Sequence, residues 1–166
     1  MLTVLTAQPI ATVRLDLLPL SVSHAEEMAE VLSDPALHTY IGGAPDSAES
    51  LRSRYRRMTA GSPDPAVSWL NWVIQPRDSG LAGTVQATVR DAVAEIAWVV
   101  GTPWQGRGIA TEAARGLVGW LLRQPVDAII AHIHPENRAS AAVAAAAGLT
   151  ATEEVHDGEI RWRRTR

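Results

Sequence analysis

A glycine-rich segment at residues 105–110 carries the strongest chemical signal in this chain of 166 residues. Gly106 and Gly108 lie where a strand-like run passes into a helix, so the first amides of that helix have no intrahelical partner. Such amides, with the positive end of the helix dipole, favour a bound phosphate. Glycine permits a close backbone approach, and Arg107 can add a charge-assisted hydrogen bond. The segment predicts a phosphate-binding loop, with a plain tight turn as the simpler interpretation.

Two kinds of phosphate-binding loop compete here. A dinucleotide-binding fingerprint would have a third glycine where Thr111 stands. It would also end the next strand on an acidic residue, whereas Asp127 begins that strand. Three expected antiparallel strands and two helices precede the loop, which fits a dinucleotide-binding unit poorly. Dinucleotide binding is therefore the second choice.

His132 and His134 are two residues apart on an apolar strand and share one face of it. A zinc site needs further Cys, His or carboxylate ligands. The chain has no Cys, and no third ligand clusters with these histidines in the sequence. We therefore predict no metal site. Packing is the first interpretation of His134, and a role as a base or in acceptor contact is the second.

The elements that must position these residues follow from the spacing of apolar side chains. Ser23 with Glu26 forms a capping box that opens one helix, and Asp46 with Glu49 opens another. Several runs rich in Trp, Val, Ile and Thr then alternate as strands between turn residues. The expected strands span residues 13–18, 68–74, 81–89 and 94–100. The last three predict an antiparallel meander.

A crossover follows the glycine-rich loop. Apolar residues from Ile109 to Leu121 form one stripe of a helix at a spacing of three or four. Residues 128–133 form a short apolar strand that can pair in parallel with the strand before the loop. Asn137 caps an Ala-rich helix that Gly148 closes. A hairpin with strands at 151–155 and 159–163 ends the chain.

The composition fits one domain over residues 1–166, with 46% hydrophobic and 20% charged residues. The absence of Cys excludes disulfides and a thiolate nucleophile. All fifteen basic residues are Arg, so Schiff-base chemistry and a Walker A loop are excluded as well. Residues 1–10 carry no positive charge before their apolar residues, and no apolar run is long enough for a membrane span. We predict a cytoplasmic protein without membrane contact.

The net charge of −3 argues against broad binding to a nucleic-acid backbone. Arg clusters at residues 52–57 and 161–166 are interpreted as solvated faces, and RNA contact is a third, weaker possibility. A homodimer stays open, because one sequence does not reveal the oligomeric state.

Residues 105–110, Gln-Gly-Arg-Gly-Ile-Ala, resemble the Q/R-x-x-G-x-G/A loop of the GCN5-related N-acetyltransferase (GNAT) superfamily, which binds the pyrophosphate of acetyl-coenzyme A (acetyl-CoA). The likeness continues at residues 111–113, 134–140 and 148–149 in the manner of the RimJ/RimL branch, and it covers about residues 12–166. It implies an α+β fold with a central mixed, mostly antiparallel sheet and about four flanking helices. A strand–loop–helix unit would form the acetyl-CoA cradle.

The resemblance also implies which residues hold the coenzyme. Backbone groups of Trp98, Val99 and Val100 would pair with the pantetheine arm, as a peptide adds to a strand edge. An amide near Val99 or Val100 would polarise the thioester carbonyl. The other implied contacts come from Gln105, Gly106, Arg107, Gly108, Ile109, Ala110, Thr111, Asn137 and Ser140. Asn137 is equally well explained as a helix cap.

Two residues resemble the catalytic positions of the family. Glu95 stands where several members deploy a Glu base, and burial there would strengthen it, although an exposed strand-end charge is the simpler interpretation. Ser140 stands where this branch has a Ser near the coenzyme sulfur. Many members carry a Tyr one turn later that protonates the leaving thiolate, and this chain has Ala144 there. Ser140 or a water is therefore the candidate acid.

The implied function is acetyl-CoA-dependent N-acetyltransfer to a primary amine, either a peptide N-terminus or a small molecule, by direct transfer in a ternary complex. An acetyl-cysteine intermediate is impossible without Cys. Acceptor contacts are expected from the first two helices and the terminal hairpin, with His38, Tyr40, Trp69 and Trp162 as candidates. The substitution at Ala144 suggests the alternative, a non-catalytic acyl-CoA-binding sensor or interaction module, ahead of a dinucleotide-binding protein.

Overall fold

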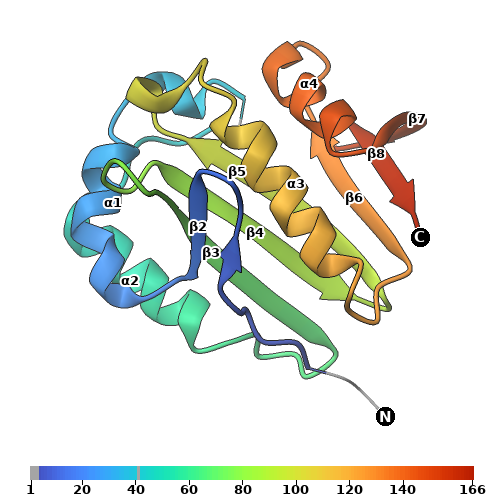
Figure 1. Ribbon diagram of the computed structural model, residues 1–166, viewed down its shortest axis with the longest axis horizontal. Helices are drawn as coiled ribbons and strands as arrows, with labels where there is room; N and C mark the ends of the chain where they lie inside the picture. The colour runs from blue at the N-terminus through green and yellow to red at the C-terminus, as the bar shows by residue number, and fades with distance from the viewer. Residues whose placement is uncertain (1–3, 41) are drawn as a thin grey trace.

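Alternating apolar side chains build an eight-stranded sheet in the computed structural model, which describes residues 4–40 and 42–166 (Figure 1). The strands are β1 (Ile10–Ala11), β2 (Leu15–Pro19), β3 (Val67–Pro76), β4 (Gly83–Arg90), β5 (Val93–Val100), β6 (Ala128–Ile133), β7 (Thr150–His156) and β8 (Glu159–Thr165). Their order across the sheet is β1-β2-β3-β4-β5-β6-β8-β7. Residues 1–3 of the N-terminal segment considered above lie outside the described residues.

The pairing confirms the expected meander and crossover. Strands β3, β4 and β5 are successive antiparallel neighbours, and β5 pairs with β6 in parallel. Every other pair recorded for the described residues is antiparallel, which fits the predicted fold and not a doubly wound dinucleotide-binding sheet. The terminal hairpin is present, and β8 inserts between β6 and β7. The short β1 was not predicted, because a two-residue strand carries no periodicity.

The described residues contain four α-helices: α1 (Ala25–Val31), α2 (Ala48–Thr59), α3 (Ile109–Leu121) and α4 (Arg138–Ala146). Side chains of β3 show how these helices are divided between the faces of the sheet. Trp72 and Ile74 enter the core that contains α3 and α4, whereas Val73 enters the core formed with α1 and α2. Since successive strand residues face opposite sides, the two helix pairs cover opposite faces (Figure 1).

Two predicted helix starts were wrong by one or two residues. A 3₁₀ turn at Val22–His24 precedes α1, so the capping box joins Ser21 to His24 in place of Ser23 to Glu26. Helix α2 is capped by Ser47, whose extended backbone lets its hydroxyl accept the amide of Ser50. Where several Ser and Asp residues lie together, the backbone conformation decides which one caps the helix.

Helix α3 follows the predicted stripe, and Ile109, Ala113, Leu117 and Leu121 are all buried. The stripe lies against the sheet and fixes the direction in which the first turn of α3 points. No helix in the described part of the chain is both long and apolar enough to cross a bilayer.

Candidate active site

Strands β5 and β6 separate beyond a short paired stretch. Their register joins Val93–Glu95 to residues 128–130 and then ends. Beyond that point the strands diverge (Figure 1), and a cavity of about 620 Å³ opens beside them. Its walls are residues 96–100 of β5, residues 131–134 from β6 onward, and the first turns of α3 and α4. The sequence signals for the loop, the strand and the Asn137 segment therefore meet at one cavity.

The backbone of β5 alternates between its two neighbours. The amide of Gly101 donates to the carbonyl of Ala82 at 2.8 Å, so this residue faces the β4 side. The carbonyl of Val99 faces the same side, because a Cβ on Gly83 would collide with it. Backbone groups point to alternate edges of a strand, so Trp98 and Val100 face the cavity. Of the three predicted backbone contacts, Val99 is therefore turned away.

The glycine-rich loop closes one end of the cavity. Gly106 and Gly108 both have a φ of +75°, the left-handed region that other residues adopt at a cost. Gly108 caps α3, and the first helical hydrogen bond runs from the amide of Glu112 to its carbonyl. The three preceding amides, those of Ile109, Ala110 and Thr111, have no intrahelical acceptor. All three residues line the cavity, as a phosphate site at this helix end requires.

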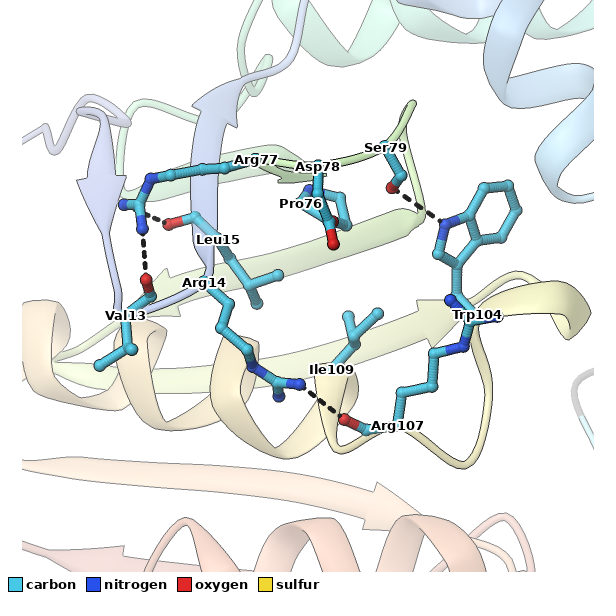
Figure 2. Close-up of a pocket in the computed structure, with 10 residues that line it drawn as sticks. All are labelled: Val13, Arg14, Leu15, Pro76, Arg77, Asp78, Ser79, Trp104, Arg107 and Ile109. Atoms are coloured by element: carbon cyan, nitrogen blue, oxygen red, sulfur yellow. Dashed lines mark hydrogen bonds between the residues drawn. The ribbon is translucent and has the colours of Figure 1, made fainter.

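Gln105 and Arg107 take different roles in this loop. The side-chain amide of Gln105 donates to the carbonyl of Val100 at 3.0 Å and ties the loop to the end of β5. Arg107 is exposed and is not among the residues that line the large cavity. Its side chain borders a second, smaller cavity of about 300 Å³ that also contains Arg14 and Trp104 (Figure 2). A direct role for Arg107 at the coenzyme phosphates is therefore not supported by this placement.

Hydrogen bonds from Thr12 and Arg14, just before β2, form a brace that holds the loop and the first turn of α3. The carboxylate of Glu112 accepts the hydroxyl of Thr12 and both the amide and the guanidinium of Arg14. Arg14 also donates to the carbonyl of Arg107 at 3.0 Å (Figure 2). Although partial burial acts in the opposite direction, these hydrogen bonds hold the pKa of Glu112 below its usual value. The brace joins residues 98 positions apart, and sequence reasoning did not find it.

We expect Glu112→Gln to lower the free energy of unfolding by about 1–2 kcal/mol near pH 7, because three hydrogen bonds to a carboxylate are lost or weakened. A carboxylate with a lowered pKa in the folded state stabilises the protein above its unfolded-state pKa of about 4.3. That contribution is lost as the pH falls through the lower folded-state pKa. Urea unfolding of both proteins at several pH values measures the difference, which should shrink toward acid pH. A difference independent of pH would contradict this account.

Asn137 and Ser140 lie on the opposite wall, at the start of α4. The Oδ1 atom of Asn137 accepts the amide of Ser140 at 3.1 Å, so the expected capping role is present. Its Nδ2 atom has no recorded partner among the described residues and can donate to a ligand. Ser140 also lines the cavity, whereas Ala144 is fully buried in the core. A Tyr at position 144 would point into the core, so this helix presents Ser140 to the cavity and not residue 144.

Two substitutions separate the roles of Asn137. Asn137→Ser keeps a capping oxygen but removes the amide donor, and Asn137→Ala removes both. We expect the free energy of unfolding of Asn137→Ser to lie within about 0.5 kcal/mol of the wild-type value. That of Asn137→Ala should be about 1 kcal/mol lower. Both should weaken acetyl-CoA binding by roughly 5- to 10-fold, the value of one hydrogen bond. Chemical unfolding and titration calorimetry measure the two quantities, and unchanged affinity in both variants would leave Asn137 with the cap alone.

Of the two environments considered for Glu95, buried and exposed, the structure shows the exposed one. Its side chain is 53% exposed, because alternation along β5 puts it on the sheet face opposite α3, beyond the cover of α1 and α2. It does not line the cavity itself. Its Oε2 atom lies 3.2 Å from Nδ1 of His132, which does line the cavity, as does Ala97 two residues further along β5. Glu95 therefore stands at the rim on the open face.

The acceptor side of the cavity is formed in part by Tyr40, one of the four predicted candidates. Its ring lies 4.9 Å from that of His134, and its hydroxyl contacts the carbonyl of Glu136 at 3.4 Å. Trp162 packs instead against the core, since its strand partner Ala131 faces α3 and α4. Trp69 and His38 are not among the lining residues. Tyr40 thereby brings to the cavity a hydroxyl besides that of Ser140.

His134, for which packing was the first interpretation and a role as a base the second, has its Nδ1 lone pair occupied. The backbone amide of Glu136 donates to this atom at 3.1 Å. The neutral ring therefore carries its proton on Nε2 and offers a donor, not an acceptor. Among the described residues, no group of three or more His, Cys, Asp or Glu side chains is arranged to hold a metal ion.

Comparisons with known proteins concern the family and the fold of the chain. The family described as acetyltransferase (GNAT) domain matches residues 14–150. No curated protein sequence matches the chain.

Solved structures share the fold over nearly the whole chain. The GNAT-family acetyltransferase of Bacillus anthracis has a TM-score of 0.79 at 20% identity, over 95% of this chain and 98% of that one. RimJ of Mycobacterium smegmatis, in complex with CoA-disulfide, has a TM-score of 0.79 at 20% identity, over 95% and 87%. The microcin C7 self-immunity acetyltransferase MccE, in complex with acetyl-CoA and AMP, has 0.76 at 18%, over 93% and 94%.

Proposed function

The chain belongs to the GNAT acetyltransferase family, and from this we propose that it transfers the acetyl group of acetyl-CoA directly to a primary amine in a ternary complex. It is an N-acetyltransferase with acetyl-CoA as co-substrate. The observation that carries the proposal is the cavity between the separated strands, which has free strand-edge groups on one wall and free helix amides at one end. The chain has no Cys that could carry the acetyl group in two steps.

The residues of the cavity fit the coenzyme by their chemistry. The amides of Ile109, Ala110 and Thr111 would bind the pyrophosphate, because they are unpaired donors at the positive end of a helix. The backbone groups of Trp98 and the amide of Val100 would pair with the pantetheine arm along β5, because the carbonyl of Val100 already accepts from Gln105. Asn137 would add its Nδ2 donor from the other wall. When bound, the coenzyme supplies an acetyl thioester, the activated group for transfer.

The reacting centre is assigned to the part of β5 that faces the cavity. A backbone amide of Trp98 or Val100 would donate to the developing negative charge on the acetyl oxygen. Glu95 lies three residues before Trp98, about 10 Å along a strand, so it would remove the amine proton through water. Ser140, Tyr40 or a water would protonate the leaving thiolate. The pair of Tyr40 and His134 would form the wall against which the amine is placed.

The acceptor is proposed by class. His132 and His134 line the cavity and Glu95 lies beside His132, so an amine would be placed near these three side chains. The proposed likeness to the RimJ/RimL branch favours a peptide N-terminus as the first candidate and a small-molecule amine as the second. The fold does not decide between them.

A thiol-release assay tests this function with little background, since the protein has no Cys to react with the thiol reagent. The purified chain is incubated with acetyl-CoA and one amine at a time. The amines are a peptide with a free N-terminus, an amino acid, an aminoglycoside and a polyamine. We expect release of free CoA with at least one amine, and mass spectrometry should find the acetyl group on that amine. Acetyl-CoA binding without turnover on any amine would instead support the sensor alternative.

A further inference from the structure

His132 lies in a chain of polar contacts on the open face of the sheet. Its side chain is 8% exposed and sits between β5 and β8. The Nε atom of Arg161 donates to Nε2 of His132 at 3.1 Å. A guanidinium has only donors, so Nε2 must be the unprotonated nitrogen. The neutral ring therefore carries its proton on Nδ1.

The protonated nitrogen faces Glu95. Nδ1 of His132 is 3.2 Å from Oε2 of Glu95, within the donor–acceptor range of a hydrogen bond. The partner nitrogen of the ring is fixed by Arg161, and Arg161 is itself 3.4 Å from the carboxylate of Glu154 on β7. The only other charged or titratable group recorded against His132 in the described part of the chain is His156, whose ring lies 5.1 Å away.

The contact between Glu95 and His132 lies where the backbone pairing of β5 and β6 ends. Glu95 and Ile130 are the last paired residues of β5 and β6, and His132 follows where the strands have separated. Arg161 is the direct partner of His132 across the β6–β8 ladder. The side-chain contact thus spans the two strands just where their backbone pairing stops. It holds the Glu95 carboxylate at the rim of the cavity, three residues before Trp98 on β5.

We propose that His132 is a positioning residue for Glu95, and that Arg161 sets the tautomer that makes this possible. The inference rests on the proposed function, because it assigns Glu95 as the base. Glu95 takes a proton from the acceptor nitrogen through a water on its remaining oxygen, Oε1. His132 keeps its proton on Nδ1 throughout and neither gives nor receives one.

The tautomer is tested without substrate. Nitrogen-15 NMR of the imidazole rings distinguishes a protonated Nδ1 from a protonated Nε2, and the spectrum of His132→Asn identifies the signals of this ring. We expect His132 as the Nδ1–H form in the wild type. In Arg161→Met the preference should weaken, because Nε2 is released and only the Glu95 carboxylate still favours a proton on Nδ1. A wild-type ring protonated on Nε2 would overturn the proposal.

The role in catalysis is tested by a double-mutant cycle with the acceptor identified in the thiol-release assay. We expect His132→Leu to lower kcat by about 10-fold through misplacement of the carboxylate, with an unchanged Kd for acetyl-CoA. His132→Asn should restore most of this loss, since its amide can donate near the position of Nδ1. In a Glu95→Gln background, His132→Leu should cause no further loss. His156→Leu is the matched control and should retain full activity.

The outcomes distinguish a failure of the role proposed for His132 from a failure of the assignment of Glu95 as the base. If His132→Leu lowers kcat equally in the wild type and in Glu95→Gln, or weakens acetyl-CoA binding as much as it lowers kcat, His132 does not act through Glu95. If Glu95→Gln itself leaves kcat unchanged, the assignment of the base fails instead. The NMR result stands apart from both, because it needs no turnover.

Discussion

Gly108→Trp should weaken acetyl-CoA binding by more than about 100-fold, the largest effect on binding that the structure predicts. Gly108 has a φ of +75° at the N-terminus of α3, and any side chain there costs about 1–2 kcal/mol in backbone strain. A Cβ on Gly108 would lie 3.4 Å from Nη2 of Arg14, and we expect the indole beyond it to cover the amides of Ile109 and Ala110. Losing two hydrogen bonds to a charged phosphate costs roughly 3–6 kcal/mol, which exceeds a 100-fold change in Kd. Titration calorimetry measures the affinity.

Gly119→Ala is the matched control for this prediction. Gly119 lies in the same helix, and a Cβ there would meet no atom within 4 Å. This variant should bind normally and gain about 0.5–1 kcal/mol in stability.

Ala110→Glu provides a second variant that keeps a helical backbone and places a carboxylate beside the phosphate site. It should weaken binding at least about 10-fold by charge repulsion. Normal affinity for acetyl-CoA in both Gly108→Trp and Ala110→Glu would show that the coenzyme does not bind at this loop.

Glu95→Gln should lower kcat by about 100-fold, the size expected for loss of a general base. The amide retains the shape of the side chain but does not take up a proton, so acetyl-CoA binding should not change. Steady-state kinetics with saturating acetyl-CoA measure kcat, and calorimetry measures Kd. Glu153→Gln, an exposed carboxylate of β7, is the control and should retain activity. A loss below about 3-fold would assign proton removal to solvent alone.

Local signals predicted much of the fold correctly. The stripe of α3, the Asn137 cap and the glycine turn before α3 depend on residues close together in the sequence, and the structure contains all three. The starts of α1 and α2 were shifted, because neighbouring Ser and Asp residues compete for the same cap. Glu95 was placed on the right strand, but the sequence left its environment open between burial and exposure. Its exposure depends on how far α1 and α2 extend over that sheet face, which no local pattern encodes.

The sequence by itself determined the element order, the family resemblance and the chemistry that the chain lacks, because composition and short motifs are properties of adjacent residues. The tertiary structure alone decided which side chains meet. It turned the backbone groups of Val99 toward β4 and brought Tyr40 to His134. It also joined Arg14 to Glu112 and Arg161 to His132. Contacts between residues 29 to 98 positions apart follow from strand order and register, which are set when the whole sheet packs.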